Sequence, residues 1–555
     1  MTTHFTALDW IIVLLYFVAI GGIAWWVMKQ KQKTATDYFL ASRHVAWYII
    51  GASIFASNIG SEHVVGLAST GVKTGVAFAH YELHSWCVLL LGWVFVPFYL
   101  RSKVFTMPEF LELRFNSSSR WFLSLMSLVT YVLTKVSVTV FAGAVVFQSL
   151  MGIDFWVGAL IIVIITGLYT AAGGLKAVVY TDTMHSIVLL LGSITVTLVA
   201  LLKAGGWGDV VSTVGPDKLN MFPKFVDWQN PSWMGFILAS PIIGIWYWCT
   251  DQCIVQRTLT AIDETHARRG TIFAAYFKLF PFFIFLIPGI AAVALKAQGQ
   301  LDFDDPNTVF PTMVAALLPV GVRGIVAGGL LAALMSSLAA VFNGCSTLFT
   351  MDIYQKIKPN ASDRELVHMG RLATIVVVAR GIIWMPLLQA LAEGSLYEYL
   401  QNVQGFLAPP ITAVFLLGIF WKRINGKGAI TALVTGFIVG MSKLALETVV
   451  KNPFGGPETG AIALPTWLDK LANFHFLYFA PLLFLGVAGL MIIVSLSTAP
   501  PDDKKLSGLT FASLTPEDKA ASRASWNKWD VIHTLIIVGI IALVMIYFSP
   551  LGVAK

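Results

Sequence analysis

Charged residues are scarce in this chain of 555 residues. Lys, Arg, Asp and Glu together make up 12% of it, about half the share typical of a soluble globular domain. Only one long polar segment, 498–528, stands between apolar runs, and we interpret it as a linker with at most a short surface helix. These shortages exclude a sizeable soluble domain, and with it a catalytic fold built on a Gly-rich phosphate loop.

Cysteine is scarce as well, and its positions exclude two further classes of protein. The four cysteines, Cys87, Cys249, Cys253 and Cys345, all fall inside apolar runs, so neither a disulfide framework nor a zinc site is expected. Lys and Arg are absent before the first apolar run, and no small-residue cleavage site follows it. We therefore expect that run to be kept as a membrane span.

Apolar runs of about 20 residues are abundant, and each is long enough to cross ~30 Å of hydrocarbon. We count about fourteen and predict an all-α polytopic membrane protein. Basic residues collect in alternate loops, about 24 on one side against about 10 on the other. By the positive-inside rule, both termini are expected outside a plasma (inner) membrane that the chain crosses many times.

Polar residues interrupt the apolar run from Ser53 to Gly66, SIFASNIGSEHVVG. Unwound backbone at this depth is tolerated where it lines a cavity or is buried by neighbouring helices. We interpret the segment as a broken helix whose free carbonyls bind a cation while its side chains face a substrate. The alternative is a kinked helix packed through its small residues.

A second apolar run, Gly328 to Tyr354, carries Ser336 and Ser337 deep inside it on a face of small residues. Hydroxyl and carbonyl oxygens are hard ligands that suit Na⁺, whereas the chain offers no thiolate or paired-His set for a transition metal. Alternatively, each serine bonds only to its own helix backbone.

Three ionisable residues, Glu82, Lys135 and Lys278, lie in strongly apolar contexts. A charge at membrane depth costs at least ~2.5 kcal/mol, so it indicates function unless it reaches the interface. Glu82 and Lys278 are suited to hydrogen-bond hydroxyls, and the aromatic run 246–249 to stack on a sugar, which together favour a neutral polyol. The alternatives are snorkelling for the two lysines and a packing belt for the aromatic residues.

Asp182 ends the run GGLKAVVYTD near the inner end of a predicted span. A carboxylate at this place could attract Na⁺ on its way to the cytoplasm. An ordinary helix N-cap explains the residue equally well.

At this point the motifs resemble those of the solute:sodium symporter family, of the sodium/glucose cotransporter type, over nearly the whole chain. The likeness lies in SIFASNIGSEHVVGLASTG (53–71), GGLKAVVYTDTMHSIVLLLGS (173–193), WYWCTDQCIVQRTL (246–259), FKLFPFFIFLIPGI (277–290), LMSSLAAVFNGCSTLFTMDIY (334–354) and LAPPITAVFLLGIFWKR (407–423). It implies a LeuT-like fold of two inverted five-helix repeats. The units would be a leading helix with its inner loop (1–45), a first repeat with an outer loop (46–232), a second repeat (233–427) and three trailing helices that include the linker (428–555).

The resemblance also implies a substrate site and an ion site. The sugar would contact His63, Tyr81, Glu82, Ser85, Lys278 and Gln401, with Asn58 beside it, Tyr247 and Trp248 at the inner gate and Tyr397 at a position where the family usually has an outer-gate Phe. The coupling ion, Na⁺, would be held by the carbonyls of Ala56, Ile59 and Ala333 and the hydroxyls of Ser336 and Ser337, with Asp182 on its exit path.

Two departures from the family pattern affect specificity. Gly244 stands where galactose carriers have Asn and glucose carriers a small polar residue, so one hydrogen bond to the sugar is absent. Ala339 and Ala340 replace the hydroxyls expected at a second Na⁺ site. Because methyl groups cannot ligate a cation, we expect one Na⁺ per sugar.

The expected function is therefore secondary active transport of a hexose, glucose or galactose, driven by Na⁺ through alternating access. Two alternatives stay open, namely a Na⁺-coupled symporter of myo-inositol or another polyol, and a sugar sensor or Na⁺ leak that does not accumulate sugar. An enzyme is not expected, since no nucleophile with a partnered base appears outside the spans. The expected partners are the sugar, Na⁺ and the lipid bilayer; no nucleic acid is expected, and the oligomeric state is left open.

Overall fold

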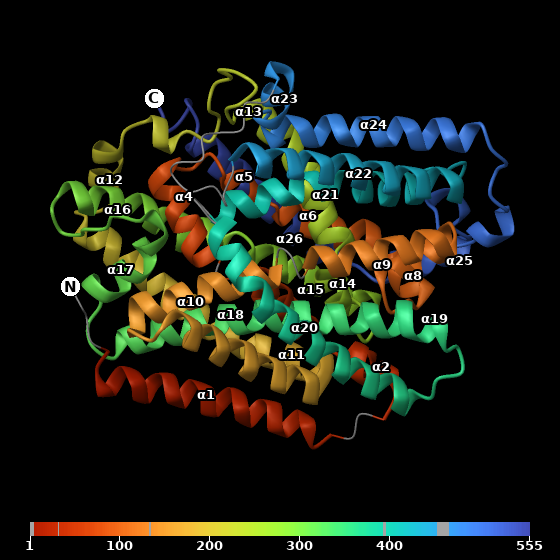
Figure 1. Ribbon diagram of the computed structural model, residues 1–555, viewed down its shortest axis with the longest axis horizontal. Helices are drawn as coiled ribbons and strands as arrows, with labels where there is room; N and C mark the ends of the chain where they lie inside the picture. Colours follow the sequence, from red (N-terminus) through yellow and green to blue (C-terminus); the bar gives the residue numbers. More distant parts are fainter. Residues whose placement is uncertain (1–4, 31–32, 61, 132–134, 392–395, 452–464) are drawn as a thin grey trace.

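The computed structural model describes residues 5–30, 33–60, 62–131, 135–391, 396–451 and 465–555. The regular secondary structure of the described chain consists of helices, apart from one isolated bridge between Val45 and Ala261. Its long helices run roughly along one axis of the molecule (Figure 1). The prediction of an all-α membrane protein is confirmed.

Eleven helical segments of the described chain are long and apolar enough to cross a membrane. They are Ala7–Met28, Ala79–Ser102, Phe155–Lys203, Trp233–Thr250, Glu264–Ala297, Val322–Ile357, Asp363–Ile383, Leu400–Phe420, Gly426–Val450, Phe476–Leu496 and Lys528–Tyr547. The most deeply buried of these segments is the one that contains α18 (Val322–Thr347). Of its most apolar stretch, 94% of the residues lie inside the protein. Helix α18 packs against α1 (Ala7–Met28), α11 (Phe155–Lys203), α20 (Asp363–Leu391) and α3 (Trp47–Asn58).

The predicted interruption within 53–66 is confirmed. Helix α3 ends at Asn58, and Ile59 is extended, with φ −83° and ψ 99°. The chain resumes as a π-helix, Glu62–Leu67, and continues in α4, Ala68–Lys73. Since α3 stops here, the carbonyls of its last turn lack the following turn that would donate to them.

A second helix is interrupted at Asp251. Helix α13 (Trp233–Ile245) passes into a π-helix, Trp246–Thr250, and then into the extended residue Asp251, after which α14 (Gln252–Thr258) begins. The Asp251 side chain accepts a hydrogen bond from the Cys253 N–H and so caps α14. The apolar pattern predicts one continuous span here, and the break was not expected.

Helix α11 is 49 residues long, about 74 Å at 1.5 Å per residue, which is far more than one crossing needs. It changes direction at Gly174, whose φ of 56° is left-handed. A Cβ at this position would lie 2.6 Å from the Tyr38 carbonyl oxygen. Gly174 therefore permits both the turn and the close approach.

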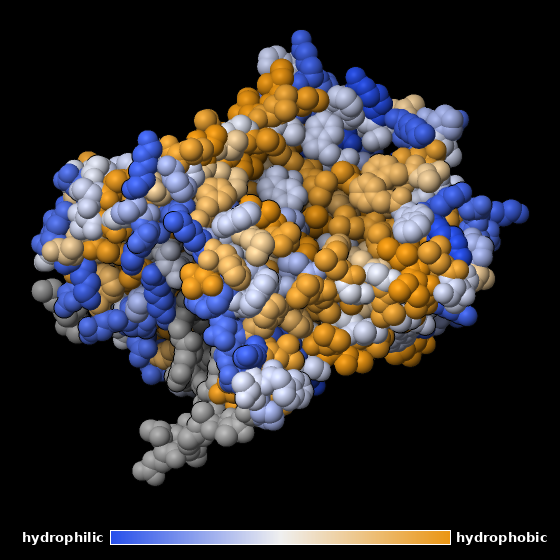
Figure 2. All heavy atoms as spheres, turned by 90° about the horizontal axis from the view of Figure 1, so that it is seen from above, coloured by the Kyte–Doolittle hydropathy of each residue, from blue (hydrophilic) through white to orange (hydrophobic). Residues whose placement is uncertain are grey.

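The face of the molecule seen in Figure 2 has the distribution expected of a membrane protein. Apolar side chains gather over the middle of the long axis, and hydrophilic ones gather toward its two ends (Figure 2). The start of α1 and the C-terminus lie at the same end of this axis, while α2 (Ala35–Leu40), α8 (Met107–Arg114) and α25 (Pro516–Ala524) lie at the opposite end (Figure 1).

The polar segment 498–528 folds onto the helix ends, with α25 as its short surface helix. Arg101 pairs with Asp518 at 3.0 Å. The buried Arg268 of α15 (Glu264–Phe277) donates to Ser525 and, at 2.7 Å, to Glu264. The segment thus connects helices from distant parts of the chain.

Candidate functional site

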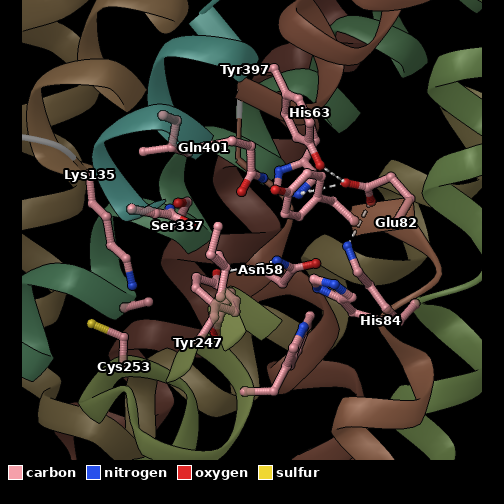
Figure 3. A pocket seen from close by; sticks show the side chains of 18 of the residues that line it. Asn58, His63, Glu82, His84, Lys135, Tyr247, Cys253, Ser337, Tyr397 and Gln401 are labelled. Atoms are coloured by element: carbon pink, nitrogen blue, oxygen red, sulfur yellow. Dashed lines mark hydrogen bonds and ion pairs between the residues drawn. The ribbon is translucent and has the colours of Figure 1, made fainter. Parts of the chain in front are cut away.

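An interior cavity lies where the two broken helices approach each other (Figure 3). Its volume is about 40 Å³, well below the ~300–1,000 Å³ usual for a small-molecule site, so its walls must move apart to admit a ligand of that size. Its lining residues are Ser57, Asn58, His63, Tyr81, Glu82, His84, Lys135, Ile243, Tyr247, Trp248, Cys253, Lys278, Ser337, Ala340, Val341, Tyr397, Leu400, Gln401 and Gln404. Nine of the ten predicted sugar-contacting residues are in this set. The tenth, Ser85, is fully buried and does not line the cavity.

One end of the cavity holds a buried carboxylate with several partners. Lys278, which follows α15, donates to Glu82 at 2.7 Å, and the Tyr397 hydroxyl donates to the other oxygen of the same carboxylate. His63 Nε2 lies 3.8 Å from it. Lys278 is only 3% exposed, so the snorkelling alternative for this lysine is wrong.

Three other lining residues carry a buried polar atom that has no hydrogen-bond partner among the described residues. These atoms are Asn58 Oδ1, the Tyr81 hydroxyl oxygen and Gln401 Oε1. An unsatisfied buried polar atom costs ~1–3 kcal/mol. The cavity therefore offers polar atoms suited to a ligand that both donates and accepts hydrogen bonds.

Tyr247 closes one side of the cavity. Asn58 Nδ2 donates to its hydroxyl at 3.2 Å, which links the two broken helices directly. The Trp248 ring stands edge-on to it at a centroid distance of 5.1 Å. The Lys135 ammonium lies 4.7 Å from its ring centre, close enough for a cation–π contact.

Lys135 also forms an ion pair that sequence analysis did not anticipate. Its Nζ lies 3.0 Å from Asp251 Oδ2, which in addition accepts from the Tyr131 hydroxyl at 2.9 Å. The lysine side chain is 11% exposed and the aspartate side chain 1%, so snorkelling is wrong here as well. The pair holds the break in the second helix next to Tyr247.

Asp182 connects the three elements around the predicted ion site. Its carboxylate accepts from Ser336 of α18 and from Ser53 of α3, both at 2.5 Å, and from Ser57 at 3.3 Å. Arg257 approaches within 3.7 Å. Because Asp182 lies inside α11 and is fully buried, the N-cap alternative is wrong.

The predicted ion ligands are of two kinds, side-chain hydroxyls and backbone carbonyls. Ser337 lines the cavity, whereas Ser336 points its proton at Asp182 and keeps its oxygen lone pairs for another partner. Ala56, Ile59 and Ala333 are buried, and the first two belong to the end of α3, where helix carbonyls become free. These oxygens suit Na⁺, a hard cation.

Gly244 is packed too tightly to carry a side chain. A Cβ there would lie 2.7 Å from Cys87 Sγ and 2.9 Å from His84 Cε1. His84 lines the cavity, and its Nε2 is hydrogen-bonded to Ser240 at 2.8 Å. The imidazole thus fills space that a larger residue at position 244 would need.

Sequence analysis missed His84, Gln404, Asp251 and Arg257. His84, Gln404 and Asp251 lie within predicted spans, which is the signal used for Glu82 and Lys278, whereas Arg257 follows a span and was expected in an inside loop. Applied to every polar residue at such depth, that signal would have included His84, Gln404 and Asp251. Three of the four have partners far away in the chain, Ser240 for His84, Lys135 for Asp251 and Asp182 for Arg257, which could not have been named from the sequence.

Broken helices enclosing a polar cavity at membrane depth are characteristic of secondary transporters, and the fold and the site define this class of protein. The chain belongs to the sodium:solute symporter family, whose model matches residues 38–436. It is thus a symporter with Na⁺ as coupling ion, and not an enzyme. It is a multi-pass membrane protein.

Several characterised proteins are similar over most of the chain. Sodium/glucose cotransporter 4 of Danio rerio is 37% identical, with 94% of this chain and 84% of the relative covered. Sodium/glucose cotransporter 1 of Oryctolagus cuniculus is 38% identical, covering 91% and 81%. Sodium/myo-inositol cotransporter 2 of Oryctolagus cuniculus is 36% identical, covering 93% and 80%.

Two solved structures share the fold. A Na⁺-coupled sialic acid symporter in a substrate-bound outward-open state has a TM-score of 0.74 at 22% identity, covering 90% of this chain and 99% of that one. MHP1, a nucleobase-cation-symport-1 family transporter, has a TM-score of 0.51 at 14% identity, covering 86% and 99%. Both are symporters of the LeuT fold, and this chain has that fold.

Proposed function

We propose that the protein uses the Na⁺ gradient to take up a hexose, glucose or galactose, by alternating access. The observation that carries this proposal is a set of polar atoms on Asn58, Tyr81 and Gln401 that lie beside an aromatic wall and lack hydrogen-bond partners among the described residues. The charges at the cavity occur in pairs, Lys278 with Glu82 and Lys135 with Asp251. Paired charges favour a neutral solute rich in hydroxyl groups, and relatives named sodium/glucose cotransporters support the same choice.

Na⁺ would bind between the end of α3 and α18, where it joins two elements that belong to different repeats. Fastening them would organise Asn58 and Tyr247, which are already hydrogen-bonded across the cavity. Sugar would then bind above Tyr247, with Tyr397 closing the outer side. A ligand drives such a change only if it binds one state more tightly, and an ion that bridges two moving elements meets this condition.

The proposed topology has fourteen crossings. The eleven long segments supply eleven crossings. A second crossing of α11, made possible by its turn at Gly174, supplies a twelfth. The interrupted stretch 47–73 would add the thirteenth crossing. Helices α9 (Ser117–Tyr131) and α10 (Ser137–Met151) would together form the fourteenth. Five-helix repeats would then occupy 46–232 and 233–427, between the leading unit 1–45 and the trailing unit 428–555.

An even number of crossings agrees with the start of α1 and the C-terminus lying at the same end of the molecule (Figure 1), and we propose that this end is external. All four native cysteines are buried. A single cysteine introduced by Ser507→Cys or Lys555→Cys, both at exposed positions, would therefore report its side by labelling with a membrane-impermeant maleimide in intact cells. Labelling at 507 but not at 555 would refute the orientation.

We infer a stoichiometry of one Na⁺ per sugar, since Ala339 and Ala340 offer no oxygen for a second ion. One charge falling through 100 mV supplies about 2.3 kcal/mol, and a tenfold Na⁺ gradient adds about 1.4 kcal/mol. Their sum sustains a sugar gradient of about 500-fold, or the square of that for two ions. A reversal potential that fits two charges per sugar would refute the inference.

Myo-inositol is the second candidate substrate, because a relative of nearly equal identity is named for it. The decisive measurement is uptake of labelled glucose into proteoliposomes under an inward Na⁺ gradient, with K⁺ replacing Na⁺ as control. Galactose and myo-inositol are added as competitors. Na⁺-dependent accumulation above equilibrium supports the symporter; Na⁺ entry without sugar accumulation would indicate a sensor or leak instead.

A further inference from the structure

Arg380 stands in the middle of an apolar helix. It lies on α20 within the run LATIVVVARGIIWMPLL, nine residues after Arg371. At 1.5 Å per residue these two arginines are about 13 Å apart along the helix axis. With Arg371 at the membrane surface, the backbone of Arg380 lies close to the middle of a ~30 Å hydrocarbon core.

The Arg380 side chain is exposed on the outer surface of the protein. Among the described residues, no hydrogen bond or ion pair connects it to another group. Other charges on apolar helices are paired within the protein, such as Lys278 with Glu82 and Lys443 with Glu447. An intramembrane charge is expensive unless it is paired or reaches the interface, so the partner of Arg380 is sought in the surrounding membrane.

An apolar groove begins beside Arg380 and follows α20 toward its N-terminal end. It is formed between α20, α9 and the π-helix Leu348–Tyr354. Its lining residues are Leu128, Val129, Phe349, Met369, Leu372, Ala373, Val376, Val377, Arg380 and Ile383. From Met369 to Ile383 it is about 21 Å long, which exceeds the ~15 Å of hydrocarbon in one leaflet, so it has the length and apolarity for an acyl chain.

We propose that this groove binds an anionic phospholipid, with an acyl chain along α20 and its phosphate drawn toward Arg380. Helical side chains lean toward the helix N-terminus, so the guanidinium extends toward the end of α20 that carries Arg364 and Arg371. These residues, with Lys356 and Lys358 of the preceding segment, make that end strongly basic. Such an end attracts anionic head groups, and arginine binds phosphate in a bidentate manner.

The test measures the thermal unfolding of the purified full-length protein in detergent with added phosphatidylglycerol or phosphatidylcholine. We expect phosphatidylglycerol to raise the unfolding temperature and phosphatidylcholine to have a smaller effect. Arg380→Gln should abolish the difference between the two lipids. Lys203→Gln, which removes an exposed charge at the C-terminal end of α11, away from the groove and its basic end, should keep it.

A second pair of variants tests the groove itself without removing a charge. Val376 lines the groove, while its neighbour Ile375 is similarly exposed but lies outside it. Val376→Trp should reduce binding of phosphatidylglycerol at least about fivefold in native mass spectrometry, and Ile375→Trp should leave it unchanged.

Two results would overturn the proposal. One is an undiminished phosphatidylglycerol effect in both Arg380→Gln and Val376→Trp. The other is a lipid-independent dimer that Arg380→Gln converts to monomers in mass photometry, since a second copy of the chain would then be the partner of this face.

Discussion

The two serines of α18 allow a sharp test of the ion site, because adjacent hydroxyls are predicted to have different roles. Ser336 donates to the buried Asp182 carboxylate at 2.5 Å, whereas Ser337 lines the cavity. A hydrogen bond to a charged group contributes ~1.5–3 kcal/mol. Ser336→Ala should therefore destabilise the protein by up to that amount even without Na⁺, and Ser337→Ala should not.

Na⁺ binding separates the two roles further. A ligand stabilises the folded state by RT ln(1 + [L]/Kd), or about 2.7 kcal/mol at 100 times Kd. Loss of one ligand oxygen in Ser337→Ala should raise the Na⁺ concentration needed for half of this stabilisation at least ~10-fold, by analogy with losses at other metal sites. Ser336→Ala should show this shift in addition to its loss of stability in K⁺.

The assay is thermal unfolding of purified protein across a Na⁺ titration at constant ionic strength, with K⁺ as the replacement ion. Ser346→Ala is the matched control, since Ser346 lies on the same helix and donates to the Gly370 carbonyl at 2.7 Å. It should lose stability without any change in Na⁺ dependence. An unchanged Na⁺ midpoint in Ser337→Ala, or full stability of Ser336→Ala in K⁺, would refute this assignment.

Three further predictions concern the cavity. Gln401→Ala should weaken sugar binding by ~1–3 kcal/mol, or about 5- to 150-fold in half-saturation for uptake; unaltered uptake removes Gln401 from the site. Lys135→Met should destabilise the protein by ~3–5 kcal/mol because it leaves the buried Asp251 carboxylate without its cation. The double variant Lys135→Met/Asp251→Asn should recover most of the lost unfolding temperature. Additive losses in the double variant would contradict the ion pair. Gly244→Asn should lower the yield of folded protein in size-exclusion chromatography because its Cβ meets Cys87 Sγ; a normal yield would contradict the packing there.

The sequence predicts much of the substrate site because a membrane makes polarity conspicuous. Glu82 and Lys278 could be chosen from the sequence alone, since each needs a reason to remain in hydrocarbon, and the family resemblance supplied Gln401. Sequence analysis missed Arg380, although its context is as apolar as that of Lys278. The break at Asp251 escaped because Trp246–Thr250 is apolar and gives no local sign of unwinding.

The amino-acid sequence by itself determined the membrane class, the apolar spans and the interruption after Asn58, because these depend on composition and local hydrogen bonding along one stretch of chain. Only the tertiary structure decided which groups meet. It paired Lys135 with Asp251 and Asp182 with serines of two other helices. The physical reason is that a buried charge must be compensated within a few ångströms, whereas its partner can come from any helix that packs beside it.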